Sequence, residues 1–137
     1  MLRNILSVIA GLVVSFIVIV VGEGITHNMF PLPSNINMND PESIKTFITT
    51  APASFHLAIL IIYALASLLG SFIASIITLT NKMSKAITVG GILMGLGIFN
   101  LVSLSHPVWA IVCGLFVFIP FAYLGGFVGI KISSKKK

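Results

Sequence analysis

Long apolar runs constrain this chain more than any other feature of its sequence. The first run begins near Ile5, and no charged residue stands between Arg3 and Glu23. A helix of about 20 apolar residues spans the roughly 30 Å hydrocarbon core of a bilayer. Because 57% of the 137 residues are hydrophobic and only 8% are charged, a water-soluble domain of this size could not bury them all. The sequence therefore predicts an all-α integral membrane protein.

Four such spans are predicted, and with their connections they form one membrane domain, a four-transmembrane-helix bundle over residues 1–137. The spans cover residues 5–24, 55–79, 86–104 and 108–130. Pro107 suits the first turn of the fourth helix, whereas Pro120 falls inside it and should kink it. The first span could also be a signal peptide, but its apolar stretch exceeds the usual 7–15 residues of such signals. We therefore expect an uncleaved anchor.

The longest connection, residues 25–54, contains a candidate short helix in "NDPESIKTFI". Asp40 is a typical N-cap residue, Pro41 suits the first helical position, and Glu42 complements the first turn. Apolar residues recur on one face of this segment. We expect an interfacial helix that lies on the bilayer surface or across the mouth of the bundle.

The basic residues predict the orientation of the chain. If four helices alternate in direction, only Lys45 falls on the side of the long loop, and the other basic residues fall opposite it: Arg3, Lys82, Lys85, Lys131, Lys135, Lys136 and Lys137. Cytoplasmic loops are enriched in Lys and Arg. Both termini, including a basic tail at 131–137, are therefore expected in the cytoplasm. The net charge of +5 then reflects contact with the lipid bilayer, and no nucleic-acid partner is expected.

Small residues recur at helical spacing in every span and predict close helix packing. The candidates are Gly11, Ser67, Gly70, Ser71, Gly91, Gly95, Gly125 and Gly129. Two of these stretches, "LGSFIA" at 69–74 and "LGGFVG" at 124–129, match small to small and aromatic to aromatic. Two parallel two-helix repeats would explain the match, although chance similarity between glycine-rich apolar helices explains it equally well.

Polar residues with possible chemistry, including Tyr63 and Asn100, gather near the outer ends of the spans. Glu23, His27, His56 and His106 are weak candidates for a zinc or copper site, because no diagnostic spacing relates them. The alternative is a solvated helix end, with the first helix ending or loosening between Gly22 and Thr26.

Three further residues have structural readings. We expect Asn100 to hydrogen-bond across helices and Trp109 to anchor the fourth helix at the interface. Cys113 is the only cysteine, so no disulfide forms within the chain. No cofactor is expected.

Five short stretches carry a resemblance to known proteins: "NILSVIAGLVV", "PLP", "NKMSKA", "HPVW" and "AYLGG". With this pattern the chain resembles an uncharacterised family of small four-helix bacterial inner-membrane proteins. The resemblance covers most of the chain and implies a bacterial inner-membrane setting. It implies no catalytic or binding residues.

No nucleophile triad, phosphate-binding loop or paired-carboxylate site is recognisable in the sequence. The leading expectation is a non-enzymatic accessory or structural subunit that binds a protein partner or a second copy of itself through the small-residue helix faces. A small oligomeric transporter or channel is the first alternative, with Glu23 as its membrane carboxylate. A metal-handling protein with an outer His and Glu site is the second.

Overall fold

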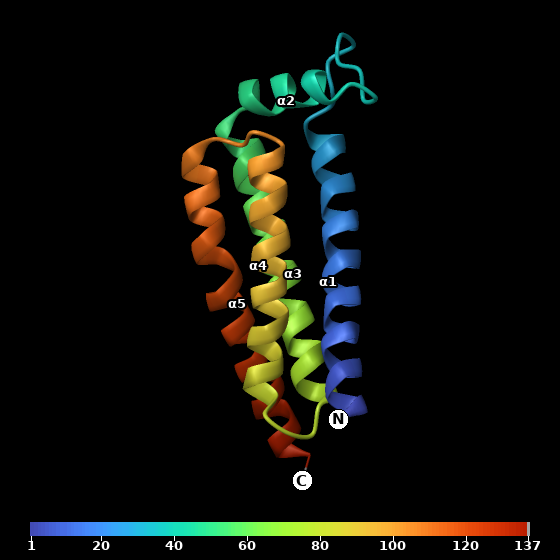
Figure 1. Cartoon of the computed structure of the whole chain (residues 1–137), viewed down its shortest axis with the longest axis vertical. Helices are drawn as coiled ribbons and strands as arrows, with labels where there is room; N and C mark the ends of the chain where they lie inside the picture. Colours follow the sequence, from blue (N-terminus) through green and yellow to red (C-terminus); the bar gives the residue numbers. More distant parts are fainter. Residues whose placement is uncertain (137) are drawn as a thin grey trace.

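The computed structural model describes residues 1–136, and over that range the chain is all helical. Four helices are long and apolar enough to cross a membrane and run side by side, while a shorter one lies across one end (Figure 1). Both termini lie at the opposite end from the short helix. The helices are α1 (Leu2–Met29), α2 (Pro41–Thr50), α3 (Ala53–Ile77), α4 (Lys82–Ser103) and α5 (Val108–Lys135). The prediction of an all-helical chain with four apolar spans is confirmed.

The ends of two helices differ from the prediction. The first helix continues without a break to Met29, although it was expected to end or loosen between Gly22 and Thr26. Two contacts explain this: the Thr26 hydroxyl donates to the Gly22 carbonyl at 3.0 Å, and a Cβ on Gly22 would lie 2.7 Å from Ile62. Packing against α3 thus overrides the low helix propensity of glycine. At the other end, α5 continues beyond the predicted span to Lys135, so residues 131–135 of the basic tail are helical.

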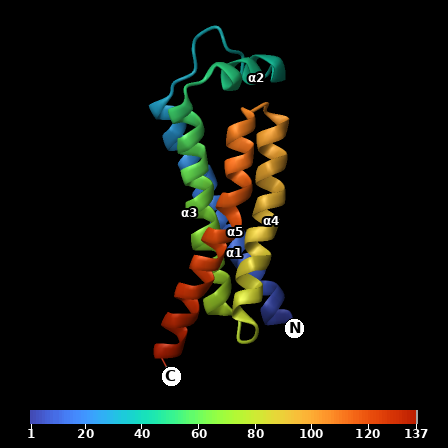
Figure 2. The ribbon, with the colours of Figure 1, turned by 90° about the vertical axis from the view of Figure 1, so that its left-hand side faces the viewer.

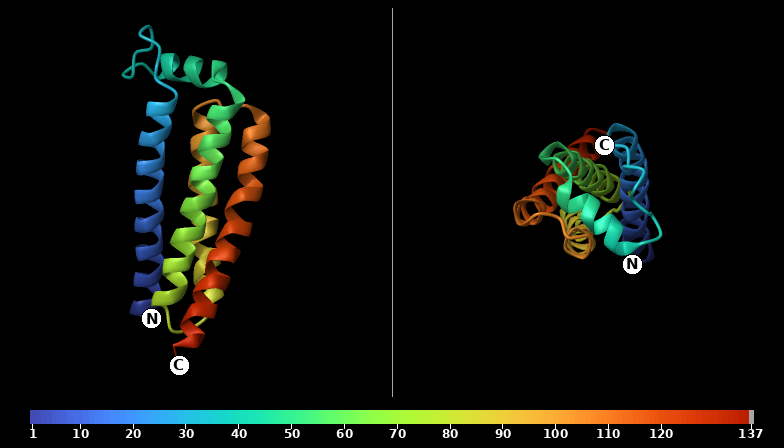
Figure 3. Two further views of the ribbon diagram at one scale, coloured as in Figure 1. Left: turned by 180° about the vertical axis from the view of Figure 1, so that it is seen from behind. Right: turned by 90° about the horizontal axis from the view of Figure 1, so that it is seen from above.

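The short helix α2 has the N-cap that the sequence predicts. The Asp40 side chain accepts from the Glu42 amide at 3.2 Å, and Pro41 occupies the first position. On its apolar face, Ile48 is buried and the Phe47 ring meets Phe55 of α3 edge-on, with centroids 5.6 Å apart. Seen from above, α2 lies across the mouth of the bundle (Figure 3).

The central element of the bundle is α3, which packs against α1, α4 and α5. α5 crosses it at an angle and makes its most extensive contact (Figure 2). One interhelical hydrogen bond from a serine hydroxyl to a backbone carbonyl ties α3 to each neighbour: Ser15 to Ala66 (2.8 Å), Ser67 to Phe118 (2.6 Å) and Ser71 to Ala86 (2.9 Å). Such bonds satisfy hydroxyl groups that find no water in a bilayer.

Glycines set the closest approaches of α3 to α1 and α5. A Cβ on Gly11 would lie 2.6 Å from the Gly70 carbonyl oxygen, so α1 and α3 touch through their backbones. A Cβ on Gly125 would meet the backbone of Leu68 and lie 3.0 Å from the Phe72 amide nitrogen. The segments 69–74 and 124–129 therefore lie against each other, and their interpretation as repeats stays a prediction.

Two of the predicted packing glycines behave differently. A Cβ on Gly91 or Gly95 would meet nothing within 4 Å, because both residues face away from the other helices. Helix packing within the chain therefore does not use this part of α4. The glycines that α4 does place against α5 are Gly90 and Gly97, where an added Cβ would clash with Ala122 and Phe118 respectively.

Candidate functional site

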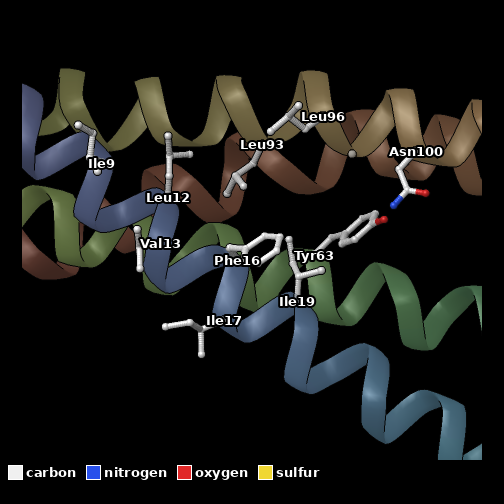
Figure 4. Close-up of a pocket in the computed structure, with 11 residues that line it drawn as sticks. Ile9, Leu12, Val13, Phe16, Ile17, Ile19, Tyr63, Leu93, Leu96 and Asn100 are labelled. Atoms are coloured by element: carbon white, nitrogen blue, oxygen red, sulfur yellow. The ribbon is translucent and has the colours of Figure 1, made fainter.

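A lateral groove opens between α1 and α4, which touch each other less than any other contacting pair of long helices. Its volume is about 500 Å³, within the range of about 300–1,000 Å³ typical of small-molecule pockets. Apart from Tyr63 and Asn100 its lining is apolar, contributed by Ile9, Leu12, Val13, Phe16, Ile17 and Ile19 of α1 and by Leu93, Leu96 and Gly97 of α4 (Figure 4).

The groove is elongated along the helices. From Ile9 to Ile19 it follows α1 for ten residue steps, or about 15 Å at a rise of 1.5 Å per residue. This is about half of the roughly 30 Å hydrocarbon core. The groove therefore has the length of one leaflet and opens sideways, where lipid chains would surround the bundle.

Two polar side chains, Tyr63 and Asn100, close the outer end of the groove and lie next to each other (Figure 4). Tyr63 is only 3% exposed, and its ring packs on Phe118 with centroids 5.4 Å apart. In residues 1–136 neither the Tyr63 hydroxyl nor the Asn100 amide hydrogen-bonds a protein group. No buried side-chain nitrogen or oxygen in that range lacks a hydrogen-bond partner, so the Tyr63 hydroxyl is accessible from the cavities that Tyr63 lines. The expected interhelical bond from Asn100 is absent because its side chain points into the groove.

A second cavity of about 240 Å³ lies beneath α2 and shares Tyr63 and Asn100 with the groove. Its polar lining includes Glu23 and His27 of α1 together with His106. Glu23 is the only carboxylate in the lining, which contains no Lys or Arg. Rings from Phe30, Phe47 and Phe55 complete the walls. The apolar groove thus adjoins a small polar chamber, hereafter the outer chamber, and Tyr63 and Asn100 line both.

Two histidines meet at the edge of the outer chamber. The Nδ1 atoms of His56 and His106 are 2.9 Å apart, and both side chains are buried. One Nδ1 must donate and the other accept, so at least one ring is neutral. Burial, and after it the proximity of His56, lowers the pKa of His106 to about 4. His106, in the loop after α4, is therefore uncharged at neutral pH.

Ring contacts around this pair connect the helices at this end of the bundle. The Trp109 indole of α5 meets the His56 ring edge-on, with centroids 5.8 Å apart, and the adjacent Phe55 ring contacts Phe47 of α2. Trp109, predicted as an interface anchor, is 41% exposed at the start of α5. His56 of α3 thus contacts His106 of the α4–α5 loop and Trp109 at the start of α5, while its neighbour Phe55 contacts α2.

The four candidate metal ligands are not brought together as a set. His56 and His106 bond each other, while Glu23 and His27 line the outer chamber from α1. Among residues 1–136, no group of three or more His, Cys, Asp or Glu side chains is positioned to hold a metal ion. Cys113 is exposed on α5.

Sequence reasoning placed Tyr63 and Asn100 near the outer side but missed the groove that they close. The signal for each residue was its isolation as a polar group within an apolar span. The sequence does not predict the separation of α1 from α4, because this depends on how both helices pack against α3.

Comparisons of the chain with protein-family models, with curated proteins and with solved structures found no match. We therefore infer the function from the geometry of the groove and the outer chamber.

Proposed function

We propose that the protein is a non-enzymatic membrane protein that binds an amphiphile, admitted sideways from the bilayer between α1 and α4. The observation that carries this proposal is an apolar groove that ends at the accessible, unpartnered hydroxyl of Tyr63, a residue that is otherwise buried. A hydroxyl in an apolar environment costs free energy unless it finds a hydrogen-bonding partner. The polar end of a ligand whose chain fills the groove would supply that partner.

The charges of the outer chamber favour an amine as the polar end of the ligand. Glu23 is the only acidic group in the lining, His106 is neutral, and no Lys or Arg is present to pair with a phosphate or carboxylate. The aromatic walls add favourable contacts for a cation. We therefore propose a single-chain amphiphile with a protonated amino group that contacts Glu23, Tyr63 and Asn100.

The proposed setting is the inner membrane of a bacterium, with both termini in the cytoplasm and α2 outside. The support is the excess of Lys and Arg at the end that holds the termini, in keeping with the enrichment of these residues in cytoplasmic loops. In this orientation the outer chamber belongs to the outer leaflet. The protein would act as an accessory subunit that presents or senses the bound amphiphile, and measured flux of the amphiphile would instead favour the small-transporter alternative.

A single tryptophan in the groove tests the proposal. In a Trp109→Phe background, Phe16→Trp places the reporter in the groove, and Phe116→Trp places it on the lipid-facing side of α5. The two positions are comparably exposed, at 67% and 73%. An alkylamine brominated along its chain should quench the Phe16→Trp protein saturably, because a site fills. It should quench the Phe116→Trp control only in proportion to its amount in the membrane.

The outcomes separate the groove from the head-group chemistry. If both reporters are quenched alike, there is no groove site and the proposal fails. If an unbrominated fatty acid of the same length relieves the quenching as well as an unbrominated alkylamine does, the groove binds amphiphiles, but the assignment of an amine head group is wrong.

A second candidate function, self-association, is favoured by one observation. Gly91 and Gly95 leave an open, lipid-facing small-residue face on α4, and such faces let helices approach closely. The other predicted packing residues are engaged within the chain. Energy transfer between labelled copies in vesicles tests it: Gly95→Leu should abolish the transfer, and equal transfer in the variant would contradict self-association through this face.

A further inference from the structure

A basic hollow lies at the end of the bundle opposite α2, remote from the groove and the outer chamber. It has a volume of about 650 Å³ and is walled by residues from α1, α3, α4 and the end of α5. Three cationic residues from different helix ends converge on it. The lining is Arg3, Phe72, Ile76, Ile77, Lys82, Ile132, Ser133 and Lys136.

In the part of the chain that the structure describes, no acidic side chain pairs with the cations of this hollow. The chain contains three acidic residues, Glu23, Asp40 and Glu42, and all of them lie at the α2 end. In the described part of the chain, the one ion pair joins Glu42 to Lys45 at that same end. Within residues 1–136, no acidic side chain therefore compensates the charge of the hollow.

Local geometry favours an anion in the hollow. The Arg3 Nε donates to the Ile77 carbonyl at 2.8 Å, which fixes the guanidinium against the end of α3 and leaves its terminal N–H groups for another acceptor. Lys82 is the first residue of α4, and Asn81 supplies no side-chain cap to that helix. The positive end of the α4 dipole thus adds to the lysine charge.

The remaining lining of the hollow is apolar. Phe72 and Ile76 of α3 and Ile132 of α5 face it from within the spans. A small soluble anion would gain nothing from these side chains. A phospholipid would place its phosphate among the cations and the start of its acyl chains along the apolar wall.

We propose that this hollow binds the phosphate group of an anionic phospholipid from the leaflet on the side of the termini. Basic pockets between helices at a membrane surface bind such head groups because the charges complement each other. This inference is independent of the amphiphile site, since it concerns other residues, the opposite leaflet and the opposite head-group charge.

A matched pair of triple variants tests the placement of the charges. The first replaces the three cations of the hollow: Arg3→Gln, Lys82→Gln and Lys136→Gln. The control replaces three nearby lysines outside the lining: Lys85→Gln, Lys131→Gln and Lys135→Gln. Both variants lose the same net charge. The full-length proteins are purified in mild detergent, and native mass spectrometry measures the retention of phosphatidylglycerol against phosphatidylcholine with the same acyl chains.

The wild type and the control variant should prefer phosphatidylglycerol, and the hollow variant should lose about tenfold of that preference, since each cation contributes modestly. If both variants lose the preference equally, or neither does, the hollow is not the site. Competition by millimolar inorganic phosphate would identify a free-anion site and overturn the lipid assignment.

Stability of the hollow variant is controlled separately. Arg3 bonds the end of α3, so its replacement could unfold the protein. The double variant Lys82→Gln and Lys136→Gln leaves that bond in place, because in the described range neither lysine side chain hydrogen-bonds a protein group. It should fold normally and lose a part of the phosphatidylglycerol preference, and full retention of the preference would contradict the proposal.

Discussion

Two glycine-to-alanine substitutions should have opposite effects on stability, although the sequence presents the two residues alike. Gly95 and Gly125 each belong to a small-residue pair spaced by four within an apolar span. In the structure Gly95 faces away from the other helices, whereas a Cβ on Gly125 would meet backbone atoms of Leu68 and Phe72. Backbone atoms cannot rotate aside as a side chain can.

The expected magnitudes follow from these contacts. Replacing glycine by alanine inside a helix gains about 1 kcal/mol of helix propensity. For Gly95→Ala nothing opposes this gain, so the free energy of unfolding should rise by up to about 1 kcal/mol. For Gly125→Ala the same gain is opposed by overpacking at about 1–3 kcal/mol. The upper end of this overpacking cost applies because α3 and α5 must move apart. The free energy of unfolding should therefore fall by about 2 kcal/mol.

Thermal unfolding in mild detergent measures the difference. At roughly 4 °C per kcal/mol, a scale taken from soluble domains, the midpoints of the two variants should differ by about 12 °C. Gly91→Ala is a further control, because it too meets nothing within 4 Å. Gly125 of α5 packs closely against α3, whereas Gly95 on the outer face of α4 does not. Equal destabilisation by Gly95→Ala and Gly125→Ala would refute this difference.

Three other predictions follow from individual contacts. The unfolded chain binds a proton at His106 near pH 6.5, but the folded chain does so only near its lowered pKa of about 4. The contribution of His106 to stability should thus be fully present above pH 6.5 and fall progressively towards pH 4. His106→Asn should make the melting midpoint less dependent on pH in this window. An unchanged pH dependence would exclude His106 as its source. Tyr63→Phe should leave the midpoint nearly unchanged yet weaken alkylamine binding about two- to tenfold, the effect of one hydrogen bond; unaltered binding would contradict the role of the hydroxyl. Asp40→Ala should remove the cap of α2, at about 1 kcal/mol, and speed hydrogen exchange in α2 but not in α3; unchanged exchange in α2 would show that the cap adds no stability.

The features that the sequence predicted well are set by local chemistry. Span number depends on the length of apolar runs, and α2 depends on Asp40 and Pro41 at its start. Both are readable without knowing which helices touch. The end of α1 was mispredicted because Gly22 and Gly24 weaken a helix only where tertiary contacts do not hold it, and Gly22 lies against Ile62.

The candidate sites depend on information that a single sequence does not contain. Gly91 and Gly90 are adjacent, yet Gly91 faces away from the other helices and Gly90 faces Ala122 of α5, because the rotation of α4 is fixed by Leu93 and other residues that it buries. The same rotation aims Asn100 into the groove and not towards another helix. The pairing of His56 with His106 likewise required the α4–α5 loop to fold against α3.

Photo-crosslinking tests most directly whether an amphiphile binds between α1 and α4. An alkylamine with a diazirine near the end of its chain is irradiated with the protein in vesicles, and the adducts are mapped by mass spectrometry. We expect adducts on the groove residues of α1 and α4, such as Leu12 and Leu96. An excess of unlabelled alkylamine should remove these adducts. Adducts spread over the exposed faces of α3 and α5, or adducts that resist competition, would contradict binding in the groove.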